Sequence, residues 1–117
     1  MMIEGPGKAL VIYVGETDHW HGKPTYAAIV ERARKEGLAG ATVTRGVMGF
    51  GGNSRIHSAS ILRLSEDLPV VIHLVDIPER IERFLPLLDE MIEGGTVMTW
   101  KVTIERYIHS KSSGGQT

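Results

Sequence analysis

The 117-residue sequence contains no cysteine, which excludes a whole set of chemistries. Without thiols there is no disulfide framework, no thiolate nucleophile and no cysteine-ligated zinc or iron–sulfur site. The lack of disulfides fits a reducing compartment, so we expect a cytoplasmic protein. A chain of this length can bury a hydrophobic core without a structural metal. We therefore predict one domain over residues 1–108 and a disordered tail over residues 109–117.

The sequence also lacks long apolar runs and blocks of like charge. The longest apolar run, residues 9–14, is too short to cross a bilayer, and no signal-peptide cleavage site follows it. Thirteen basic residues against 14 acidic residues leave a net charge of −1. Nucleic-acid binding usually requires a basic surface, so nucleic acid is not expected as a partner.

Short apolar segments predict the strands. Apolar residues alternate with period two, or fill short runs, over residues 8–15, 41–48, 70–75 and 96–108. A further short strand is expected over residues 61–64. The segments 8–15 and 70–75 are apolar on both sides, which is typical of strands covered on both faces.

Two amphipathic helices are predicted between these strands. The first should begin at Pro24 and the second at Pro78, because proline suits the first helical position. Gly37 and the glycine pair 94–95 should end them. Pro86 lies inside the second helix, where proline removes a hydrogen bond and clashes with the preceding turn, so a kink or short break is expected.

The order strand, helix, strand, strand, helix, strand predicts an α+β fold of the ferredoxin-like type, βαββαβ. In that fold two helices cover one face of a four-stranded antiparallel sheet. The other face would be apolar here, because the first and third strands carry apolar residues on both sides. We therefore expect a homo-oligomer that covers this helix-free face.

A glycine-rich segment follows the second predicted strand. Gly49, Gly51 and Gly52 allow positive φ and let backbone amides turn toward one point, which suits phosphate or carboxylate oxygens. A flexible hairpin loop explains the same glycines, and GFGG matches neither the P-loop nor the dinucleotide fingerprint. Arg55 and His57 could contact a ligand or a partner from this loop, and solvent exposure explains them equally well.

Two cationic side chains are candidate anion contacts. Arg45 lies in a strand of small and apolar residues directly before the loop, where its guanidinium would suit a phosphate or a structural carboxylate. Lys23 lies at the N-terminal end of the first predicted helix, whose amides favour anions. A solvated lysine is the alternative for Lys23.

His19 and His21 flank Trp20 and could place two imidazoles on one side of an extended segment as metal ligands. The segment supplies no third ligand, so no metal site is expected. Glu66 and Asp67 adjoin in a predicted turn, but general acid–base catalysis would also need a nucleophile or a second positioned acid. No enzymatic activity is predicted.

Three segments together resemble a known family: HGKPTYAAIVERA, GLAGATVTRGVMGFG and IHSASILRLSEDLPVVIHLVD. They are similar to an uncharacterised bacterial and archaeal PII-like family, related to the nitrogen-regulatory PII signalling proteins, over roughly residues 8–107. The resemblance implies a compact trimer, with three clefts between subunits that suit an adenine nucleotide or a similar anion. It also implies a mobile loop that responds to the ligand, and it implies no catalytic activity.

In PII proteins the nucleotide site is lined by the loop base and by the start of the same strand from a neighbouring subunit. The matching positions here are Gly49, Phe50 and Gly51, and Gly40, Ala41 and Thr42.

Three departures from the PII pattern limit what the resemblance implies. Thr96 stands where a phosphate-binding lysine is expected, so tight triphosphate binding is not implied. The last strand lacks the paired arginines of PII proteins, although Lys101 or Arg106 could substitute. The loop has no tyrosine between Gly49 and Ser60, so it offers no acceptor for uridylylation.

The sequence thus predicts a trimeric PII-like regulatory protein that binds AMP, ADP or ATP and reports it to a partner through the loop over residues 49–60. A membrane transporter or channel is the partner that the family's gene neighbourhood suggests. One alternative is a divalent-metal-binding oligomer that uses His19 and His21 and resembles the cation-tolerance proteins. Another is an enzyme or a structural trimer.

Overall fold

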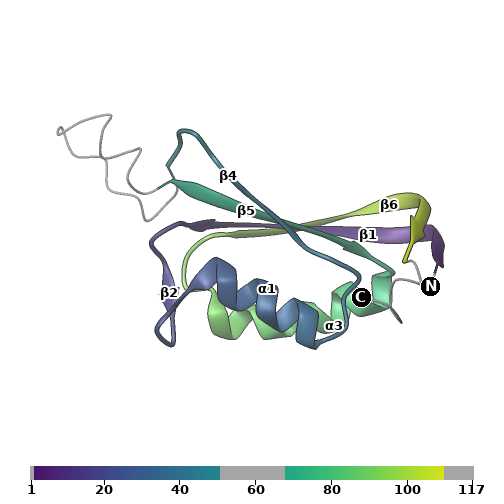
Figure 1. Ribbon diagram of the computed structural model, residues 1–117, viewed down its shortest axis with the longest axis horizontal. Coiled ribbons are helices and arrows are strands. Elements are labelled where there is room, and N and C mark those ends of the chain that lie inside the picture. Colours follow the sequence, from purple (N-terminus) through teal and green to yellow (C-terminus); the bar gives the residue numbers. More distant parts are fainter. Residues whose placement is uncertain (1, 51–67, 110–117) are drawn as a thin grey trace.

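The described chain, residues 2–50 and 68–109 of a computed structural model, forms a four-stranded sheet with two helices on one face (Figure 1). The sheet order is β4-β5-β1-β6, and every neighbouring pair is antiparallel. This is the predicted ferredoxin-like α+β fold, which is therefore confirmed. The elements are β1 (Met2–Gly15), β2 (His19–Trp20), β3 (Lys23–Pro24), α1 (Thr25–Lys35), β4 (Thr42–Arg45), β5 (Pro69–Asp76), α3 (Pro78–Met91) and β6 (Thr96–Ile108).

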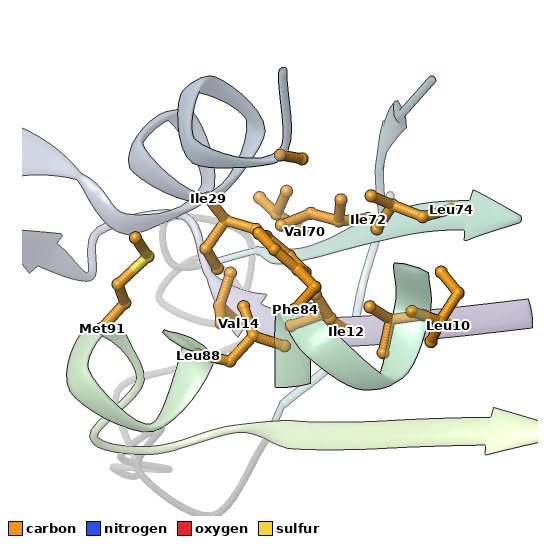
Figure 2. Close-up of a cluster of buried hydrophobic side chains, with 12 residues drawn as sticks. Leu10, Ile12, Val14, Ile29, Val70, Ile72, Leu74, Phe84, Leu88 and Met91 are labelled. Atoms are coloured by element: carbon orange, nitrogen blue, oxygen red, sulfur yellow. The ribbon is translucent and has the colours of Figure 1, made fainter. Parts of the chain in front are cut away.

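The hydrophobic core lies between the two central strands and the helices. Register places Ile12 of β1 beside Ile72 of β5, so alternate residues of both strands face the helices together. Figure 2 shows these side chains meeting Phe84 and Leu88 of α3 and Ile29 of α1. Each large aliphatic or aromatic side chain buried in this way contributes about 1.5–3 kcal/mol.

Helix α1 begins within one residue of the predicted position and ends as its glycine predicts. Pro24 is the N-cap, and Gly37 adopts φ of +85° after the last turn. The Gly37 amide donates to the Arg34 carbonyl at 3.1 Å, and the Leu38 amide donates to the Ala33 carbonyl at 3.1 Å. This is a Schellman motif, and it turns Leu38 onto the core.

Helix α3 has no break at Pro86 and ends earlier than expected. It starts at Pro78 as predicted, but it continues through Pro86 without a break and ends at Met91, before the glycine pair. Pro86 lies on the exposed face, while the buried residues Ile81 and Leu88 anchor the turns on both sides of it. Packing therefore holds the helix together across the missing hydrogen bond. Ile92 after it is already extended.

Two strand boundaries also differ from the prediction. β1 begins at Met2 rather than Lys8, because residues 2–7 pair with the far end of β6 through a register shift between Ile3 and Gly5. β4 ends at Arg45 rather than Met48. The short strand expected over residues 61–64 and most of the predicted tail lie outside the described residues.

The helix-free face of the sheet is apolar, as expected from the sequence. Ala9 and Val11 of β1 lie opposite Trp100 and Met98 of β6 on this face, and both β1 residues are only 5% exposed. Trp100 and Met98 are exposed in the single chain. On the other side of β1, the side chain of Val75 in β5 lies on the same face and is exposed as well.

Gly95 gives a stability test of the turn that leads into β6. Its φ is +149°, and a Cβ added there would clash with the Tyr13 carbonyl oxygen. We expect Gly95→Ala to lower the free energy of unfolding by about 2 kcal/mol or more, because both the backbone conformation and the contact are unfavourable for alanine.

Gly40→Ala is the matched control, since no atom lies within 4 Å of its added Cβ. Urea unfolding of both variants measures the difference. Equal stability of the two variants would show that the turn relaxes around the added methyl group.

Candidate functional site

The two predicted halves of the nucleotide site lie at opposite ends of β4. Gly40 and Ala41 precede the strand, while Gly49 and Phe50 follow it. The four residues of β4 separate them by about 10 Å or more at roughly 3.3 Å per residue. The chain therefore does not bring the halves together within one copy. Gly51, Arg55 and His57 lie outside the described residues.

The loop base, residues 46–50, folds closely against the first residue of β5. The Gly46 amide donates to the Pro69 carbonyl at 2.8 Å. A Cβ on Gly46 would lie 2.8 Å from the Pro69 ring, and one on Gly49 would lie 3.0 Å from it. Glycine is therefore needed for this close approach. The side chains left exposed at the loop base are Val47, Met48 and Phe50.

Arg45 forms an ion pair with Glu16, the residue directly after β1. The Arg45 side chain is 62% exposed and the Glu16 side chain is 22% exposed. The structural carboxylate considered for Arg45 thus exists in the chain. Sequence reasoning did not identify Glu16, because β5 separates β4 from β1 and only the sheet order brings the end of β1 to Arg45.

Lys23 is also paired with a carboxylate. Its Nζ lies 2.6 Å from Oε1 of Glu31, on the exposed surface of α1. Arg106, a candidate substitute for the missing arginines, lies 3.8 Å from Glu4. Such exposed pairs contribute only about 0–1 kcal/mol, so a phosphate could replace either carboxylate as the partner of its cation at small cost.

The two histidines of the candidate metal segment lie in the β2–β3 hairpin. The His19 Nδ1 atom is 2.7 Å from the Thr17 carbonyl. The His21 ring stacks on Trp20, with centroids 3.8 Å apart and planes 8° apart. Trp20 donates from Nε1 to the Glu90 carbonyl of α3 at 2.9 Å, which docks the hairpin on the helix end. Trp20 and the stacked His21 thus help to hold the hairpin against the end of α3.

No group of three His, Cys, Asp or Glu residues in the described ranges could hold a metal ion. A cavity of about 100 Å³ beside the hairpin is lined by Asp18, His19 and Thr25, by the last residue of α3, Met91, and by the three residues after it. It is small against the roughly 300–1,000 Å³ of typical ligand pockets. Within the described residues no helix is long and apolar enough to cross a membrane.

Comparison with known proteins assigns the family. The DUF190 family, described as an uncharacterized ACR, matches residues 7–104. The chain belongs to the DUF190 family. A UPF0166 protein of Methanocaldococcus jannaschii is 43% identical over 86 residues, which are 74% of this chain and 79% of the relative. A UPF0166 protein of Aquifex aeolicus is 41% identical over 78 residues, which are 67% of this chain and 74% of the relative.

Solved structures show that this DUF190 chain has a PII-like fold. A PII-like protein from Thermus thermophilus matches with a TM-score of 0.60 and 18% identity, over 86% of this chain and 91% of that one. CPII, a nitrogen regulatory PII-like protein from Thiomonas intermedia K12, matches with a TM-score of 0.61 and 14% identity, over 89% of this chain and 98% of that one. That CPII structure is bound to ADP, AMP and bicarbonate. The resemblance seen in the sequence is confirmed for the family and the fold.

The Arg45–Glu16 pair can be tested by a double-mutant cycle with Arg45→Gln, Glu16→Gln and the double variant. We expect a coupling energy of about 0.2–1 kcal/mol, because both side chains are partly exposed. The coupling should shrink in about 1 M NaCl, where screening is effective beyond roughly 3 Å. Urea unfolding measures it, since urea adds no salt of its own.

The Lys23–Glu31 pair serves as the comparison, because both of its side chains are more than half exposed. Its coupling should be the smaller of the two. A coupling of zero at low salt would mean that Arg45 and Glu16 do not pair in solution.

Proposed function

We propose that this protein is a cytoplasmic, homotrimeric PII-like regulator that binds an adenine nucleotide in clefts between its subunits and catalyses no reaction. The observation that carries this proposal is the separation of the two halves of the site by β4. A cleft between copies can unite them, with the loop base of one subunit meeting residues 40–42 of its neighbour. The structures of CPII with ADP, AMP and bicarbonate, and of CPII with ADP and bicarbonate, support a nucleotide as the ligand class.

The apolar helix-free face supports the oligomer. The exposed side chains on this face include Trp100 and Met98 of β6, Tyr13 of β1 and Val75 of β5. Exposed apolar surface of this kind is unfavourable in water and is typical of an interface. Packing against the same face of further copies would cover it in a closed assembly.

The charges near β4 support an anionic ligand of modest affinity. Arg45 is the first candidate phosphate contact, because its side chain is largely exposed and its present partner is a single carboxylate. Lys23 is a second candidate. Thr96 begins β6 where PII proteins carry lysine, so we expect ATP to bind only modestly. The loop over residues 49–60, including Arg55 and His57, would report the bound ligand to a partner such as a membrane transporter or channel.

Calorimetric titration with AMP, ADP and ATP tests the ligand. We expect binding by the wild type, and Arg45→Gln should weaken it about ten- to a hundredfold, because a charge-assisted contact is worth roughly 1.5–3 kcal/mol. Arg83→Gln, on the exposed face of α3, is the control and should leave the affinity unchanged. If none of the three nucleotides binds at millimolar concentration, the nucleotide proposal fails.

Light scattering with a pair of β6 variants tests the assembly. Trp100 and Val97 are 48% and 43% exposed, and register places them on opposite faces of the sheet. Trp100→Lys should convert the trimer to smaller species, because it introduces a charge into the proposed interface. Val97→Lys should leave the trimer intact. A monomeric wild type at micromolar concentration would refute the oligomer.

A further inference from the structure

Asp76, at the end of β5, is a buried carboxylate that holds several elements together. It is 1% exposed. Its Oδ1 atom accepts from the Ile77 amide at 2.7 Å and lies 3.4 Å from Nη1 of Arg80 in α3. Its Oδ2 atom accepts from the Ala39 amide at 2.8 Å. A buried carboxylate needs such donors, because without them it is strongly destabilised.

The Ala39 residue is held from a second side as well. The Tyr107 hydroxyl, from the end of β6, donates to the Ala39 carbonyl oxygen at 3.0 Å. Side chains of two different strands therefore bind the amide and the carbonyl of the same residue. Through these bonds the turn between α1 and β4 is attached to the ends of β5 and β6.

This attachment lies directly before the exposed segment of residues 40–42. The Schellman motif fixes the chain as far as Leu38, and Ala39 is the next residue. A Cβ on Gly40 would find no atom within 4 Å, and Gly40, Ala41 and Thr42 are all exposed. Thr42 is paired with His73 of β5, so Gly40 and Ala41 lie between the sheet and Ala39, and their path depends on the orientation of Ala39.

We propose that Asp76 and Tyr107 are positioning residues for the nucleotide site, acting through Ala39 to set the path of Gly40 and Ala41 toward the cleft of the neighbouring subunit. This inference rests on the proposed function, in which that segment completes a neighbour's site. It assigns a role in ligand affinity to two residues that are remote from β4 in sequence and act through Ala39.

Tyr107→Phe and Arg80→Gln form the decisive pair of variants. The first removes only the hydroxyl that binds the Ala39 carbonyl. The second removes a contact of the same carboxylate but leaves the bond from Ala39 to Asp76 in place. Asp76→Asn is a weaker test, because it also disturbs a buried charge and can unfold the chain.

Two measurements are made on each variant: amide hydrogen exchange at Ala39 relative to the core amide of Ile72, and calorimetric titration with ADP. Tyr107→Phe should speed exchange at Ala39 and raise the Kd for ADP about three- to tenfold, as expected for one lost hydrogen bond. Arg80→Gln should change both measurements less than Tyr107→Phe, because the Asp76 carboxylate loses its longest contact, at 3.4 Å, and keeps its bonds from Ala39 and Ile77.

Unchanged exchange at Ala39 in Tyr107→Phe would overturn the proposal, and so would faster exchange with an unchanged Kd. An equal loss of affinity in Arg80→Gln would also overturn it, because general loosening would then explain the effect. A wild type that binds no ADP refutes the proposed function and the inference with it. A wild type that binds ADP with the same Kd as Tyr107→Phe refutes the inference alone.

Discussion

The architecture depends on the burial of two central strands that are apolar on both faces. β1 and β5 pair over eight residues and present alternate side chains to the helices and to the opposite side. Helices α1 and α3 cover one side. On the other side Ala9 and Val11 of β1 are buried, while Trp100 and Met98 of the neighbouring strand β6 are exposed. The apolar residues of these strands form the core on the helix side and leave an apolar surface on the helix-free side. The fold and the proposed assembly are therefore linked through one pair of strands.

The fold could be predicted from the sequence wherever a local pattern decides the structure. The clean alternation of β6, Pro78 at the start of α3 and Gly37 after α1 are such patterns. The prediction failed where contacts between residues far apart in the sequence determine the local structure. Residues 2–7 contain two glycines and a proline, which disfavour a strand, and only pairing with β6 makes them one. Pro86 has a strong local effect, which the buried turns on either side outweigh.

The candidate site could be predicted only in part. The residue types of Arg45 and Lys23 indicated anion contacts but did not identify their carboxylate partners. Glu16 lies beside Arg45 because of the sheet order, and Glu31 lies eight residues after Lys23 in the chain. Asp76 gave no local signal, because an aspartate between a strand and a helix is common in turns. Its bond to Ala39 spans 37 positions. In the proposed function the nucleotide site forms between copies, so its geometry depends on contacts between chains rather than on a local sequence pattern.

The contact of the loop base with Pro69 has a consequence for how this protein can diverge. Gly46 is hydrogen-bonded to Pro69, so the two residues that flank residues 47–68 are held together at the sheet. Once the ends are joined, doubling the length of the intervening chain costs only about 0.6 kcal/mol in closure entropy. The closure itself depends on Gly46 and Pro69, so changes at these two residues are costly. The sequence between them can therefore diverge without rebuilding the core.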